Sequence, residues 1–93
     1  MITRIITNHI KEGHKEEYIK VSKAFCAAML ERDGCLEAKV YDVEGDDTLV
    51  IYVERWPDLE TADGVMKNGT FGEFVPQLFP HFAGNETLVL HEA

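Results

Sequence analysis

The sequence of 93 residues contains few cysteines, few basic residues and no long hydrophobic run. Its two cysteines, Cys26 and Cys35, are too few for a disulfide framework and lack the Cys-x-x-Cys spacing of zinc and redox motifs. We therefore interpret both as small buried hydrophobic residues. Lysine and arginine total 9 against 17 aspartates and glutamates, a net charge of −8. Because nucleic acids and acidic membranes are bound through clustered lysines and arginines, the sequence predicts neither as a partner.

The longest apolar run, residues 24–30, is far shorter than the ~20 residues that a membrane-spanning helix needs. Residues 1–11 alternate polar with apolar side chains and lack the continuous apolar region of a signal peptide, so we expect a cytoplasmic protein. The histidines are scattered without the spacing of a metal site, and no metal is predicted. His81, which follows Pro80 in a phenylalanine-rich segment, is the only histidine that we consider as a general base.

Hydrophobic periodicity predicts strands and helices in the order β-α-β-β-α-β. In the first strand, Ile2, Ile6 and Ile10 fall on one face. The expected elements are strand 2–11, helix 14–32, strand 35–43, strand 48–56, a short helix from residue 58, a kinked helix from residue 70 to near residue 82, and strand 86–92. This order predicts a single α+β domain, 1–93, of the ferredoxin-like split βαβ type, with a four-stranded antiparallel sheet covered by helices on one face.

The strand predicted at 48–56 is apolar on both faces. Its two faces carry Val50, Tyr52 and Trp56 on one side and Leu49, Ile51 and Val53 on the other. Only one set can meet the helices, and the other would leave a larger apolar patch than soluble monomers usually expose. The sequence therefore predicts a homodimer in which two sheets pack face to face.

Four short motifs give the chain a resemblance to a known family. They are Ile10-Lys11-Glu12-Gly13 after the first strand, Asp33-Gly34-Cys35-Leu36 before the second, Val53-Glu54-Arg55-Trp56-Pro57-Asp58 at the end of the third, and Thr70-Phe71 at the start of the later helix. Each motif is weak by itself, but their order and spacing over nearly the whole chain resemble those of antibiotic biosynthesis monooxygenase domains. The resemblance implies a dimeric α/β barrel built from ferredoxin-like protomers.

The resemblance also implies an activity. Members of this family include oxygenases that act on quinols and polyketide anthrones without a cofactor, and relatives that degrade haem. The chain departs from the haem-degrading branch, since Val75 and Val65 stand where that branch has a histidine ligand and a pocket tryptophan. Many quinol-oxidising relatives have a histidine where this chain has Val65-Met66. We therefore expect oxidation of a hydroxylated aromatic, quinol or anthrone by O₂, with no metal, flavin or haem cofactor.

Three polar residues are site candidates through the same resemblance. Trp56 corresponds to a tryptophan that contacts substrate in anthrone-type monooxygenases, Tyr52 lies on the same strand face, and Asn8 resembles a pocket asparagine of the haem-degrading branch. Oxygenation of a phenolic substrate needs its anion, so we expect Trp56 and Asn8 to donate hydrogen bonds to substrate oxygens. Tyr52 is expected to act as an acid, a base or an orienting group. The alternatives are a core tryptophan bonded to a backbone carbonyl, a packing tyrosine and an asparagine satisfied by the backbone.

Apolar side chains of the helical regions are candidates for the wall of a small aromatic substrate's pocket. The candidates are Phe25, Met66, Phe71 and Phe74. The same residues can fill an ordinary core, so a second function stays open: a non-enzymatic dimer that binds a small apolar ligand or serves as an accessory module. The missing helix histidines favour this second function. A cavity with polar groups pointing into it would favour the enzyme, and a filled core would favour the module.

Overall fold

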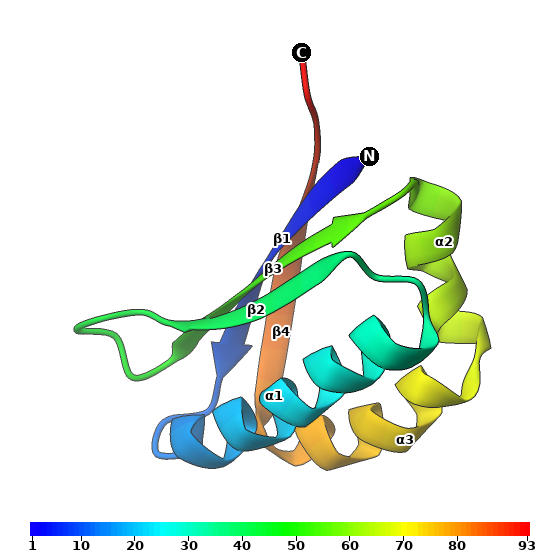
Figure 1. Ribbon diagram of the computed structural model, residues 1–93. Helices are drawn as coiled ribbons and strands as arrows, with labels where there is room; N and C mark the ends of the chain where they lie inside the picture. The colour runs from blue at the N-terminus through cyan, green and yellow to red at the C-terminus, as the bar shows by residue number, and fades with distance from the viewer.

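Four antiparallel strands form one sheet, and the helices lie together on one of its faces (Figure 1). The computed structural model describes residues 1–93, with the elements β1 (Ile2–Ile10), α1 (Lys15–Arg32), β2 (Glu37–Asp42), β3 (Leu49–Trp56), α2 (Leu59–Gly64), α3 (Gly69–Leu78) and β4 (Phe82–His91). Short 3₁₀ turns at Val65–Lys67 and Phe79–His81 flank α3. The strand order β2-β3-β1-β4, with neighbouring strands antiparallel, confirms the predicted α+β ferredoxin-like arrangement.

The helix ends follow local sequence signals. After α1, Gly34 adopts a φ of +77°, a conformation that residues with side chains rarely take. At the start of α2, which the sequence predicted at residue 58, the Asp58 carboxylate caps the helix by accepting a hydrogen bond from the Thr61 N–H at 2.7 Å. α3 begins at Gly69, one residue before the predicted start at residue 70, because the Asn68 side chain caps it by accepting from the Thr70 N–H at 3.2 Å. No helix has both the length and the apolar composition that a membrane crossing requires.

The last strand is longer than predicted. β4 begins at Phe82, whereas the sequence predicted a strand at 86–92. The predicted start was wrong because the pairing between β4 and β1 shifts register next to Ile10, and Gly84, with a φ of +142°, fits that irregularity within the strand. The early start brings Phe82 and Asn85 into the sheet beside β1.

The two faces of the sheet have different environments. The face toward the helices carries the core residues Ile2, Ile6 and Ile10 of β1 and Val50, Tyr52 and Trp56 of β3, all buried. The opposite face carries Ile5 of β1 and Leu49, Ile51 and Val53 of β3, which are only partly buried. Leu88 and Leu90 of β4 pair beside Ile5 and Thr3 on this outer face and are 60% and 43% exposed. The protomer therefore leaves one apolar face of its sheet without a cover.

Candidate active site

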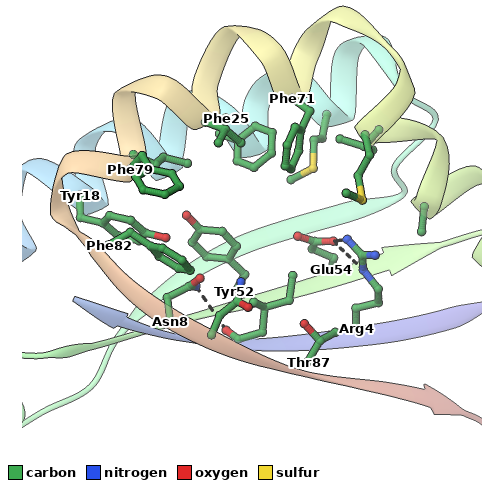
Figure 2. Close-up of a pocket in the computed structure, with 18 residues that line it drawn as sticks. Arg4, Asn8, Tyr18, Phe25, Tyr52, Glu54, Phe71, Phe79, Phe82 and Thr87 are labelled. Atoms are coloured by element: carbon green, nitrogen blue, oxygen red, sulfur yellow. Dashed lines mark hydrogen bonds and ion pairs between the residues drawn. The ribbon is translucent and has the colours of Figure 1, made fainter.

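A cavity of about 440 Å³ lies between the inner face of the sheet and the helices. Figure 2 shows its floor formed by side chains of β1 and β3 and its roof formed by the helices. Phe82, Asn85 and Thr87 of β4 line one side. Most of the lining is apolar, and the polar groups of the floor gather at two places along the strands, near Asn8 and near Arg4.

Three of the predicted wall residues line this cavity. Phe25 comes from α1, Met66 from the first 3₁₀ turn and Phe71 from α3. Met66 is 67% exposed, which places its side chain at the mouth of the cavity. Phe74 does not line the cavity, because its ring packs on that of Phe25 with the centroids 5.6 Å apart. It therefore supports the wall without facing a ligand.

Asn8 lies on the cavity floor, and its amide nitrogen already donates hydrogen bonds to backbone carbonyls. Its Nδ2 donates to the Val50 carbonyl at 3.2 Å and to the Ile6 carbonyl at 3.5 Å, whereas its Oδ1 accepts no hydrogen bond. The only fully enclosed side-chain polar atom without a partner in the structure is Asp33 Oδ2, so Asn8 Oδ1 borders the cavity. The side chain thus presents an acceptor to the cavity instead of the donor that we expected.

Two tyrosines lie on the same side of the cavity as Asn8. The Tyr52 hydroxyl and Ser22 Oγ share a hydrogen bond of 2.5 Å, and the Tyr18 ring stacks on Tyr52 with the centroids 6.4 Å apart. Burial raises the pKa of Tyr52, and the neighbouring Tyr18 hydroxyl raises it further. Burial also raises the pKa of Tyr18, although its interaction with Tyr52 offsets part of the rise. Both phenols therefore stay protonated near neutral pH, so they can donate a hydrogen bond but cannot act as bases.

An ion pair between a partly buried arginine and a buried glutamate occupies the other polar part of the floor. Arg4 and Glu54 are direct partners across β1 and β3, and the Arg4 Nε and Nη2 atoms donate to Glu54 Oε1 at 3.3 and 3.0 Å. The Trp56 indole N–H donates to the same oxygen at 2.9 Å. Glu54 is 1% exposed and Trp56 is 0% exposed. These donors fix the Glu54 carboxylate in one position at the wall of the cavity.

Trp56 lies apart from the cavity into which the expected donor would point. It does not line the cavity, and its indole N–H donates to Glu54. The alternative prediction, a core tryptophan bonded to a backbone carbonyl, was right about burial and wrong about the acceptor. The reason is the strand period: residues 54 and 56 point to the same side of β3, so the carboxylate comes within reach of the indole.

The sequence interpretation missed Arg4 and Glu54, although a signal for them was present. Arg4 lies between Ile2 and Ile6 on the inner face of β1, and Glu54 lies between Tyr52 and Trp56 on the inner face of β3. Two opposite charges at inward-facing positions of two apolar strands must pair or border a polar site, since an isolated buried charge is very costly.

Other candidates from the sequence lie outside the cavity. His81 does not line it, and the Nδ1 atoms of His81 and His14 are 2.9 Å apart, so His81 is not placed as a base for a ligand there. Cys26 and Cys35 are buried free thiols, as predicted, and burial raises their pKa values to about 12 and about 11. No three histidine, cysteine, aspartate or glutamate side chains are grouped closely enough to hold a metal ion.

The fold and the cavity define a class of protein: a ferredoxin-like protomer with an aromatic-walled pocket between its sheet and its helices. A crystal structure of an antibiotic biosynthesis monooxygenase has this fold, with a TM-score of 0.87, 17% identity, and coverage of 100% of this chain and 99% of that one. A conserved protein from Methanosarcina mazei Go1 gives 0.84 and 20%, covering 100% and 94%. SnoaB, a cofactor-independent oxygenase from Streptomyces nogalater, gives 0.86 and 12%, covering 99% and 92%. At these identities the likeness shows the fold alone.

The sequence itself identifies the family. A model of the antibiotic biosynthesis monooxygenase family matches residues 1–77. The chain belongs to this family, which confirms the resemblance inferred from its motifs. No curated protein matches the chain significantly.

Proposed function

We propose that this protein is a cofactor-independent monooxygenase that oxidises a hydroxylated aromatic, quinol or anthrone-type substrate with O₂. The substrate supplies the electrons. For an anthrone, the reactive CH₂ group loses two hydrogens and gains one oxygen atom as a carbonyl, and the second oxygen atom of O₂ leaves as water. The reaction requires the electron-rich anion of the substrate and a site that keeps bulk water away.

One observation carries this proposal: the cavity combines aromatic walls with unused polar groups on its floor. Asn8 Oδ1 can accept a hydrogen bond from a substrate hydroxyl, because its amide nitrogen is bound to the Val50 and Ile6 carbonyls. Tyr18 or Tyr52 can donate to a substrate carbonyl or phenolate oxygen, since both stay protonated. In this proposal Trp56 acts through Glu54 and does not contact the substrate. The volume of about 440 Å³ is in the range of small-molecule sites.

A homodimer is part of the proposal. The outer face of the sheet carries branched apolar side chains that the protomer does not cover, namely Ile5, Leu49, Ile51, Val53, Leu88 and Leu90. A second copy that packs the same face against them would remove this surface from water, and each buried Å² contributes roughly 25 cal/mol. A cytoplasmic location also stays a prediction.

Oxygen uptake with a panel of hydroquinones and anthrones tests the activity. We expect uptake to depend on the protein and to fall roughly 10-fold or more in Asn8→Ala, which removes the free acceptor. Tyr52→Phe tests whether the Tyr52 hydroxyl donates a hydrogen bond to the substrate. Its control is Tyr41→Phe on β2, which removes the same hydroxyl outside the cavity. Wild-type protein that consumes no oxygen above the buffer rate with any member of the panel would exclude the proposed reaction.

The second candidate function is a non-enzymatic dimer that binds a small apolar ligand. It is favoured by one observation: no histidine lines the cavity, and the charged side chains that do, Arg4 and Glu54, already pair with each other. Oxygen consumption distinguishes the two functions. A binding module would bind anthrones, detectable by quenching of tyrosine and tryptophan fluorescence, without any protein-dependent oxygen consumption.

A further inference from the structure

Glu54 is the only carboxylate that lines the cavity, and its two oxygens have different surroundings. Oε1 accepts hydrogen bonds from Arg4 and Trp56, whereas Oε2 accepts none from the protein. Because Asp33 Oδ2 is the only fully enclosed polar side-chain atom without a partner, Oε2 of the buried Glu54 must border open volume. Figure 2 shows Glu54 beside Arg4 in the cavity.

This arrangement is unusual for a structural ion pair. A buried carboxylate is costly unless both oxygens are satisfied, and here the donors are gathered on one oxygen. The lone pairs of Oε2 instead meet a space with mainly apolar walls. A bound molecule with an acidic O–H or C–H group is what the free oxygen can interact with there.

We propose that Glu54 is the catalytic base of the reaction and that Arg4 and Trp56 are positioning residues that hold its carboxylate. The proposal rests on the proposed oxygenase function, since it names the group that forms the substrate anion. The other residues considered as bases do not meet the requirement. Tyr18 and Tyr52 stay protonated, and His81 lies outside the cavity.

The proton and the electrons balance for an anthrone. A carbon–hydrogen bond of the CH₂ group breaks, its electron pair stays on the substrate, and the proton moves to Glu54 Oε2. The anion is oxidised by O₂, a carbon–oxygen bond forms, and Glu54 returns the proton to the distal peroxide oxygen. Glu54 then takes the second proton from carbon as the C=O bond forms and the O–O bond breaks. That proton joins the departing hydroxide, which leaves as water, and the carboxylate is restored.

Arg4 makes this transfer electrostatically acceptable in a buried site. Arg4 Nη1 also lies 3.8 Å from the exposed carboxylate of Asp63, which the transfer leaves unchanged. Before the transfer the rest of the cluster contains a guanidinium, a carboxylate and a neutral substrate, and afterwards it contains a guanidinium, a carboxylic acid and a substrate anion. The net charge is unchanged, so no additional charge has to be buried. The guanidinium lines the cavity and lies over the Trp56 ring, 6.0 Å from its centroid, so it stays close to the negative charge in both states.

Exchange of substrate hydrogen for deuterium isolates this step from the chemistry of oxygen. Anthrone is incubated anaerobically in D₂O with wild-type protein, and incorporation of deuterium at the CH₂ carbon is followed by NMR. The same preparations are then assayed for oxygen uptake in air. We expect Glu54→Gln, which keeps the shape and the acceptor for Arg4 and Trp56, to lower both rates at least about 100-fold.

Two further variants complete the experiment. Glu37→Gln removes the same charge from β2, where Glu37 pairs with Lys39 and Arg55 outside the cavity, and we expect both rates to stay at the wild-type level. Glu54→Asp keeps the charge and withdraws the carboxylate by one methylene group, so both rates should fall between those of wild type and Glu54→Gln. Circular dichroism verifies that each variant is folded.

Each outcome has a separate meaning. Exchange by folded Glu54→Gln within threefold of wild type would overturn the role of Glu54, and oxygen uptake by wild type would leave the oxygenase function standing. Exchange that depends on Glu54, without oxygen uptake, would support the base and refute the oxygenase. Wild-type protein that shows neither reaction would overturn both proposals. If Glu54→Gln does not fold, Glu54→Asp tests the role of Glu54. Deuterium exchange by Glu54→Asp at the wild-type rate would contradict the proposed role.

Discussion

Replacement of Trp56 by phenylalanine should destabilise the protein strongly, because the indole N–H donates to a buried carboxylate. The bond to Glu54 Oε1 is 2.9 Å long, and both side chains are almost completely buried. A hydrogen bond to a charged group contributes about 1.5–3 kcal/mol, and the smaller phenyl ring adds a packing loss of roughly 1 kcal/mol. We therefore expect the free energy of unfolding to fall by about 3 kcal/mol. For a domain of this size each kcal/mol lowers the Tm by about 4–8 °C, so the melting temperature should drop by more than about 10 °C.

A double-mutant cycle separates the hydrogen bond from packing. Urea unfolding of wild type, Trp56→Phe, Glu54→Ala and the double variant gives the coupling free energy between the two side chains, which we expect to be about 1–3 kcal/mol. Tyr41→Phe on β2 is the aromatic control, since Tyr41 lies beside Ile51 on the opposite face of the sheet from Glu54, and its Tm should stay within a few degrees of wild type. Additive effects of the two substitutions would show that the indole N–H does not hold Glu54 and would remove Trp56 from its positioning role.

Four more outcomes are expected. Ile51→Lys and Val53→Lys on the outer face of the sheet should convert the proposed dimer into a monomer, measured by light scattering after gel filtration; an unchanged molar mass would rule out the face-to-face dimer. Tyr52→Phe should cost about 1 kcal/mol in urea unfolding, because Ser22 loses its hydroxyl partner, and a stability equal to wild type would contradict the 2.5 Å hydrogen bond. Cys26 and Cys35, with pKa values raised from 9.0 to about 12 and about 11, should resist iodoacetamide at pH 8 in the folded protein and react in urea. Because their thiols ionise at lower pH in the unfolded chain, the free energy of unfolding should fall as the pH rises from about 9 toward 12. Cys26→Ala should reduce that fall, and equal slopes for the variant and wild type would refute the assignment.

The sequence predicted the fold because its signals are local. The period of Ile2, Ile6 and Ile10 assigns the inner face of β1, and Asp58 marks the start of α2 without knowledge of any distant residue. The limits of β4 were wrong because Gly84 is in a turn or in a strand depending on its pairing with β1, which is a contact across the whole chain. A glycine alone does not distinguish the two.

The lining of the cavity was predicted in part for the same reason. Asn8 was selected by its family resemblance and lines the cavity, but its orientation depends on the Val50 carbonyl of another strand. Trp56 was selected by family likeness, and the direction of its N–H depends on a carboxylate two residues earlier and on an arginine at the other end of the chain. Residue types therefore indicated which strand positions carry polar groups. Only the tertiary contacts show which atom of each polar side chain has no hydrogen-bond partner in the protein.

The positions of Asn8 and Arg4 on β1 set the distance between the two polar parts of the cavity floor. They lie four residues apart on one strand face, roughly 13 Å along β1, and Glu54 lies opposite Arg4. A ligand that contacts the polar groups at both places therefore has to span a large part of this length. A fused polycyclic molecule with oxygen substituents at its far edges can contact both. Under the proposed function, we therefore expect faster turnover of elongated polycycles than of simple hydroquinones.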